Sequence, residues 1–313
     1  MSIKKRHIYN TDKLKICYKQ PQQLFDYLSN FENGDFVHYD CFSLQILDNG
    51  KSNDKTDKPS TLIKANCLMQ EGIILGTFEF HNSSKFEGKC FFTFENKVHY
   101  TCAGNYPHKY NLLPAFEYVE QVLGLEKNNI TKIEIACDVN FNPVPKILKM
   151  IKDSENYDLI INGKVVESDE QIIKEYGEYY ERSRKKKKRY PTIYINQKRD
   201  DAPSLTIYDK ATEMRVNNKE YISEWNGYTT STQYRIEVSV KNEDIKQFLN
   251  EIGKDVEHWG ELGLFLTNLT TPAFLECIWV WITNRMLRFR LKNDFRTIIT
   301  LHDLTSGEVD VQP

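Results

Sequence analysis

Three segments of the 313-residue chain carry polar or ionisable side chains at every second position within otherwise apolar sequence. This alternation predicts strands in which the polar groups share one face and the aliphatic groups the other. If residues 132–138, 205–210 and 234–240 form neighbouring strands, one sheet face gathers carboxylates, a phenol and cations. The groups expected there are Glu134, Asp138, Tyr208, Lys210, Arg235 and Glu237. Clustered carboxylates suit Mg²⁺ or Mn²⁺, which prefer oxygen ligands, and a phenol beside a cation can act as a nucleophile.

The same alternation also has a purely structural explanation. An antiparallel sheet with one solvated face shows polar and apolar residues in turn without any function. Periodicity alone does not distinguish the two explanations. The chain contains 18 tyrosines, so composition gives no reason to single out Tyr208.

A second feature is a run of seven basic residues in the eight positions 182–189, with tyrosines on both sides of it. Cations that neutralise phosphates release condensed counterions, and aromatic rings among them suit stacking on unpaired bases. The run therefore favours a nucleic-acid partner, although a solvated loop has the same composition. Its basic residues are Arg182, Arg184, Lys185, Lys186, Lys187, Lys188 and Arg189.

Composition excludes several other classes of protein. With 40% hydrophobic and 27% charged residues, disorder of the whole chain is not expected, and a net charge of -2 gives no global sign of nucleic acid or membrane binding. The longest apolar stretch, residues 274–282, contains Glu276 and falls short of the roughly 18 residues that a bilayer requires. We find no secretory signal, C-x-x-C pair, P-loop or G-x-G-x-x-G sequence, so we expect a cytoplasmic protein with reduced thiols and no membrane partner.

The periodicity along the chain predicts an α+β fold with a mixed, largely antiparallel central sheet, flanking helices and a helical C-terminal segment. A polar lead-in is expected over residues 1–35, with a helix at its end, and a helical region with a polar tail over 243–313. Asn162-Gly163 predicts the tight turn of a hairpin over 159–166. Strands are expected at 36–47, 73–81, 89–101, 132–140, 192–196, 205–209 and 234–241, and helices at 22–29, 111–123, 169–181 and 274–290.

Taken in order, several short motifs resemble the plasmid rolling-circle replication initiation factor family, which includes relaxases of some integrative conjugative elements. The resemblance covers residues 36–242, which would form the catalytic domain. The motifs are Thr131–Asp138, Thr192–Ile195, Leu205–Glu213 and Tyr234–Val238, with His38–Leu44 and Phe92–Asn96 upstream.

The resemblance implies a DNA nicking and strand-transfer enzyme that initiates rolling-circle replication at an origin. The tyrosine of the family's I-Y-x-K motif is Tyr208 here, and it would attack a phosphodiester, form a 5′-phosphotyrosine and free a 3′ hydroxyl. Lys210 would favour the phenolate, and Arg235 could hold a phosphate oxygen. The implied partners are origin DNA, duplex or single-stranded, a host helicase and a second copy of the chain. The implied Mg²⁺ or Mn²⁺ ligands are Glu134, Asp138 and Glu237, with Glu95 a weaker candidate.

Two departures from the family pattern keep alternatives open. Thr206 stands where the family commonly has arginine, and Asn196–Arg199 replaces a glycine-serine-arginine stretch. Lys198, Arg199 and the basic run could supply the missing phosphate contact. The alternatives are a conjugative relaxase with the same chemistry and a DNA-binding relative that has lost cleavage.

Overall fold

The structure is a computed structural model, and it describes most of the chain in nine ranges. They are residues 7–50, 62–69, 72–96, 112–166, 192–195, 203–228, 232–252, 268–269 and 271–306.

The chain forms two compact units, each assembled from segments that are distant in sequence. Unit 1 comprises residues 1–11, 134–252 and 271–313, and unit 2 comprises residues 12–133 and 253–270. The strands β1 (His7–Lys19) and β7 (Glu126–Val139) contribute residues to both units. Each unit therefore depends on pairing between segments that are far apart along the chain.

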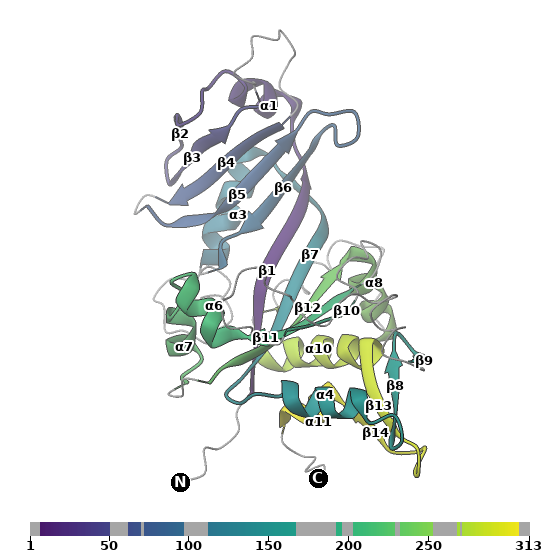
Figure 1. Ribbon diagram of the computed structural model, residues 1–313. Coiled ribbons are helices and arrows are strands. Elements are labelled where there is room, and N and C mark those ends of the chain that lie inside the picture. The colour runs from purple at the N-terminus through teal and green to yellow at the C-terminus, as the bar shows by residue number, and fades with distance from the viewer. Residues whose placement is uncertain are drawn as a thin grey trace. The chain divides into compact units, whose positions relative to one another are not determined.

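Unit 1 contains a sheet with the strand order β10-β11-β12-β7-β1 (Figure 1). β10 (Ile193–Ile195), β11 (Ser204–Asp209) and β12 (Tyr234–Lys241) pair antiparallel, and their aliphatic side chains are buried. The helix α10 (Pro272–Met286) packs on β12, where the buried Trp279 donates its indole N–H to the carbonyl of Ile236 at 3.2 Å.

Shorter elements make up the rest of the described part of unit 1. They form a second sheet, with the strand order β14-β13-β8-β9, and further helices. The strands are β8 (Tyr157–Ile161), β9 (Lys164–Val166), β13 (Leu287–Leu291) and β14 (Ile298–Thr300); the helices are α4 (Val144–Lys152), α6 (Lys210–Val216), α7 (Tyr221–Trp225), α8 (Asn242–Glu251) and α11 (Leu301–Ser306).

Unit 2 contains the strand order β7-β1-β6-β5-β4-β3-β2, with antiparallel pairing from β1 to β2. One face of this sheet packs against α3 (Leu112–Leu123), where the Phe116 ring lies 4.3 Å from Phe92 and 4.6 Å from Phe94 between centroids. The remaining elements are α1 (Gln22–Leu28), β2 (Phe36–His38), β3 (Phe42–Asp48), β4 (Leu62–Met69), β5 (Ile74–His81) and β6 (Lys89–Phe94).

The predicted α+β class is confirmed, and so are the strands expected to carry the polar face. The hairpin at residues 159–166 also forms, because Asn162 and Gly163 take the positive φ values of 51° and 77° that its two-residue turn requires. None of the described helices has the length and apolar character needed to cross a bilayer. The helix expected at 169–181 lies outside the described residues.

Three predictions of local structure were wrong. Residues 7–19, expected within a polar lead-in, form β1, whose polar Asn10 and Thr11 are buried rather than solvated. Residues 36–47 form two strands instead of one, and β4 was missed. The helix expected to reach residue 290 ends at Met286, because Leu287–Leu291 alternates strictly and buries Leu287 and Phe289 in β13.

Candidate active site

The register of β11 and β12 brings the predicted site residues of these two strands together. Tyr208 lies opposite Arg235, and Thr206 lies opposite Glu237. Residues directly opposite in an antiparallel pair share a face of the sheet. The antiparallel pairing of β11 with β12 therefore forms part of the polar face that the alternation predicted.

The Tyr208 phenol lies between an anion and a cation. Its hydroxyl donates to Glu237 Oε2 at 3.3 Å, and Lys210 Nζ donates to the same hydroxyl oxygen at 3.5 Å. The lysine ammonium also lies 5.6 Å from the centre of the tyrosine ring. A carboxylate that accepts the phenol's hydrogen bond orients the hydroxyl, and a nearby ammonium favours the phenolate.

Lys210 reaches this position from a helix rather than from the strand. β11 ends at Asp209, whose side chain accepts the backbone N–H of Thr212 at 3.0 Å and so caps α6. Lys210 is the first residue of α6, is only 2% exposed, and forms an ion pair with Glu213 Oε2 at 2.6 Å. A buried ammonium keeps its charge when a carboxylate lies beside it.

Glu213 is a residue that the sequence analysis did not select as functional. Burial acts to raise the pKa of its carboxyl, but contacts with Lys210, Asn217 and Lys219 outweigh this effect, so the pKa is lowered. Its negative charge is thus maintained beside Lys210. Its sequence signals were its place at the end of the motif Leu205–Glu213 and its spacing of three residues from Lys210.

Asp138 and Arg235 form a buried bidentate ion pair. Arg235 Nε donates to Asp138 Oδ1 at 2.6 Å, and Nη2 donates to Oδ2 at 2.8 Å. Their exposed fractions are 1% and 0%. We expected Asp138 to bind a cation and Arg235 to hold a phosphate oxygen; in the structure these two groups bind each other.

Neutral side chains complete the surroundings of Asp138. Asn226 Nδ2 donates to Asp138 Oδ2 at 2.9 Å, and the Asn10 amide approaches the same oxygen at 3.5 Å. The Tyr228 hydroxyl donates to the Asp138 carbonyl at 2.6 Å. Both carboxylate oxygens are thus engaged by protein donors, which is the condition under which a buried charge pair is retained.

A different set of carboxylates could hold a metal ion. Asp12, Glu134 and Glu237 are half-buried, and one oxygen from each lies within 4.8 Å of the others. Asn96 orients Asp12 by donating to Oδ1 at 3.1 Å and to the backbone carbonyl at 2.8 Å. Three carboxylate oxygens are a donor set that fits Mg²⁺ or Mn²⁺.

Asp12 was missed by the sequence analysis because it stands in a segment interpreted as a polar lead-in. The weaker candidate Glu95 is exposed and does not belong to this cluster, although its neighbour Asn96 contacts Asp12. The basic run at 182–189, together with Lys198 and Arg199, lies outside the described residues, so their role as DNA contacts stays a prediction.

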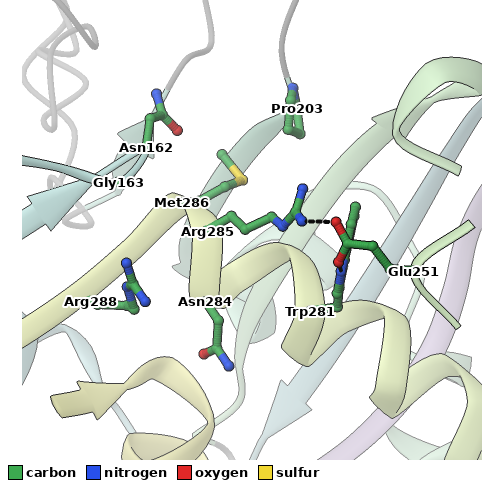
Figure 2. A pocket seen from close by; sticks show the side chains of 9 residues that line it. All are labelled: Asn162, Gly163, Pro203, Glu251, Trp281, Asn284, Arg285, Met286 and Arg288. Carbon is green, nitrogen blue, oxygen red and sulfur yellow. Dashed lines mark hydrogen bonds and ion pairs between the residues drawn. The ribbon is translucent and has the colours of Figure 1, made fainter. Parts of the chain in front are cut away.

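Unit 1 also contains a pocket of about 510 Å³ whose lining includes Glu251, Trp281 and Arg285 (Figure 2). Figure 2 shows Arg285 extending to Glu251, with which it forms an ion pair. Trp281 donates to the same carboxylate at 2.6 Å, and the guanidinium lies 3.9 Å from the indole ring. These polar groups bind one another, and the described residues that line the pocket include neither a phenol nor an acidic cluster. The chemistry is therefore not placed there.

No protein-family model and no curated protein matches this chain. Among solved structures, the chain is similar to the rolling circle replication initiator protein from Geobacillus stearothermophilus, with a TM-score of 0.44 and 12% sequence identity. The similarity covers 91% of this chain and 87% of that one. At this identity, no site residue is transferred from that protein to this chain.

Asp138→Asn is expected to lower the free energy of unfolding by roughly 3–5 kcal/mol, because the variant leaves the Arg235 guanidinium buried without its counter-charge. Urea denaturation measures the loss. Glu243→Gln is the control: it removes an exposed ion pair with Lys246 at 3.2 Å and should cost less than about 1 kcal/mol. Equal losses in the two variants would contradict a structural role for the buried pair.

Glu134→Gln and Glu237→Gln are each expected to weaken Mn²⁺ binding by roughly tenfold or more, because a hard cation loses an anionic oxygen ligand. Titration calorimetry with MnCl₂ on the purified protein measures the affinity without any nucleic acid. Glu95→Gln serves as the control and should bind Mn²⁺ like the parent. A loss of Mn²⁺ affinity in Glu95→Gln, with unchanged affinity in Glu134→Gln and Glu237→Gln, would show that the cation binds outside this cluster.

Proposed function

We propose that this protein is a metal-dependent DNA-nicking and strand-transfer enzyme that initiates rolling-circle replication, with Tyr208 as its nucleophile. The observation that carries the proposal is the position of the Tyr208 hydroxyl, 3.3 Å from Glu237 Oε2 and 3.5 Å from Lys210 Nζ. A phenol has a pKa of about 10 and is a weak nucleophile at neutral pH unless its phenolate is favoured. Here a carboxylate acceptor and a buried ammonium both contact the hydroxyl.

The cation would be held by Asp12, Glu134 and Glu237, whose oxygens lie within 4.8 Å of one another. When bound, Mg²⁺ or Mn²⁺ polarises the scissile phosphate and offsets the charge that develops on it. Glu237 belongs to this set and also accepts the hydrogen bond of Tyr208. The nucleophile and the phosphate-activating group would therefore be adjacent.

The chemical step follows from these positions. The phenol proton leaves toward Glu237 Oε2, and Lys210 stabilises the resulting oxyanion. The Tyr208 oxygen then forms a bond to the phosphorus while the bond from phosphorus to the 3′ oxygen breaks, and that oxygen takes up a proton. The product is a 5′-phosphotyrosine and a free 3′ hydroxyl. Reversal with another 3′ hydroxyl completes strand transfer, so no external energy source is needed.

The buried residues near the phenol position it rather than contact the substrate. Arg235, opposite Tyr208 in the sheet, is held by Asp138, and its Nη1 lies 3.9 Å from Glu237 Oε2. Lys210 is held by Glu213. We assign Asp138, Arg235 and Glu213 as positioning residues, which replaces the direct phosphate contact first expected of Arg235.

The resemblance of the motifs supports DNA as the substrate and the 5′ direction of the covalent bond. The basic run at 182–189 would supply phosphate contacts. A host helicase and a homodimer remain predictions from the resemblance. A conjugative relaxase would use the same residues and the same covalent step at a transfer origin.

A non-catalytic DNA-binding protein is the second candidate, and Thr206 is the observation that favours it. Thr206 lies in β11 between Tyr194 and Glu237 of the neighbouring strands, where the family's arginine would place a cation beside the acidic cluster. Without that cation, the cation that contacts the phenol among the described residues is Lys210. Binding without a covalent adduct would support this candidate.

Tyr208→Phe should abolish a protein–DNA adduct that survives denaturation, while salt-sensitive DNA binding is retained. The parent is incubated with Mn²⁺ and supercoiled origin plasmid or single-stranded oligonucleotide, and the adduct is detected by denaturing electrophoresis. Tyr194→Phe is the matched control, because Tyr194 lies one strand away in β10. An adduct that persists in Tyr208→Phe and disappears in Tyr194→Phe would move the nucleophile to Tyr194.

Glu213→Gln should shift the alkaline limb of the pH–rate profile for adduct formation to lower pH. Without the adjacent carboxylate, burial favours the neutral amine of Lys210, and the phenolate loses its cation as pH rises. The double variant Lys210→Arg/Glu213→Gln keeps a permanent cation and should restore the limb toward that of the parent. A uniform decrease at every pH, with no movement of the limb, would mean that Glu213 acts only on folding.

A further inference from the structure

The sheet of unit 2 has one apolar face and one polar face. Side chains on the apolar face, such as Phe78 and Phe92, are buried against α3, where both rings approach Phe116. Along β1, β6, β5 and β4 the opposite face carries half-buried polar and aromatic side chains, which we call the open face. Its central residues are Lys13, Lys15, Lys64, Asn66, Thr77, Glu79, His81, Lys89, Phe91 and Thr93.

The strand register places lysines around one aromatic ring of the open face. Phe91 lies opposite Glu79, which in turn lies opposite Lys64. Lys89 lies two residues before Phe91 in β6, and Lys15 Nζ is 5.1 Å from the Phe91 ring. Lys15 of β1 therefore lies beside Phe91, Lys89 lies on the same face of β6, and Lys64 lies two strands away, beyond Glu79.

The open face carries a net positive charge although the whole chain is slightly acidic. Among the described central residues of the open face, Glu79 is the one carboxylate, and it is paired with Lys15 at 2.5 Å. Within the part of the chain that the structure describes, Lys13, Lys64 and Lys89 have no ion pair. This charge is complementary to a polyanion.

Aromatic rings at one end of the open face form a partly exposed cluster. Phe86, His81 and Phe91 lie 5.2 to 5.6 Å apart between ring centroids. Lys85 Nζ lies 5.2 Å from the Phe86 ring. Half-buried rings with ammonium groups beside them offer stacking surfaces for unpaired bases together with phosphate contacts.

We propose that the open face of unit 2 binds single-stranded DNA, with bases stacked on Phe91 and Phe86 and phosphates near Lys64 and Lys89. Duplex DNA hides the faces of its bases, so an aromatic surface of this kind selects the unpaired strand. The proposal rests on the proposed function only in naming DNA as the nucleic acid, and it does not involve Tyr208. The open face would hold a single strand that is exposed at a nicked or melted origin.

The test uses the full chain with Tyr208→Phe, so that no covalent adduct contributes to binding. Fluorescence anisotropy with a labelled oligothymidine gives the affinity over a series of salt concentrations. Phe91→Leu, which keeps an apolar side chain, should weaken binding by about fivefold or more. Lys64→Gln/Lys89→Gln should lower the slope of log affinity against log salt by roughly 1.4, because each lost phosphate contact removes about 0.7.

Controls are chosen off the open face. Tyr27→Leu removes an exposed aromatic ring on α1, and Lys149→Gln removes an exposed lysine on α4; both should bind like the Tyr208→Phe parent. Unchanged affinity in the open-face variants, with native circular dichroism, would overturn the proposal. An equal loss of affinity for duplex DNA in the open-face variants would also overturn it. So would a change in their oligomeric state with no change in their affinity for oligothymidine. A loss of oligothymidine affinity in the open-face variants supports the proposal whether or not the parent protein, with Tyr208 intact, forms a covalent adduct.

Discussion

The buried ion pair between Asp138 and Arg235 is the constraint on which the polar face of unit 1 depends. Both charges are removed from water, so the pair is tolerated only because the guanidinium binds both carboxylate oxygens and Asn226 satisfies one of them further. Asp138 belongs to β7 and Arg235 to β12, directly opposite Tyr208 in β11. The pair therefore joins β7 to β12 beside the phenol. It holds β12 in place, and Glu237, two residues after Arg235 in that strand, accepts the hydrogen bond of Tyr208.

Exposure separates the residues that can meet a substrate from those that hold them in place. Tyr208, Glu134 and Glu237 are half-buried, whereas Asp138, Arg235 and Lys210 are nearly inaccessible. The same division explains the importance of Glu213, whose carboxylate keeps a buried ammonium charged beside the phenol. A fixed charge in a site of low dielectric interacts more strongly than the same charge in water. A single buried ammonium can therefore stabilise the phenolate.

The sequence predicted the strands and their polar face, because a period of two is a local property that survives folding. It did not predict how deeply each carboxylate is buried: Glu134 and Asp138 were expected to act alike, yet Asp138 is buried and bound by Arg235, whereas Glu134 is half-buried. Asp12 was missed because the burial of Asn10 and Thr11 depends on partners distant in sequence, such as Asn226 for Asn10. Lys210 was expected on the strand, and its true position follows from the capping of α6 by Asp209.

The most direct measurement of the central claim is the identity of the residue that carries the nucleotide. The covalent adduct is digested with nuclease and trypsin and the modified peptide is sequenced by mass spectrometry. Trypsin releases residues 200–210, in which Tyr208 is the sole tyrosine, separately from residues 190–198, which contain Tyr190 and Tyr194. The account predicts a nucleotide attached to the peptide 200–210. A nucleotide attached to residues 190–198, or to any other tyrosine, would contradict it.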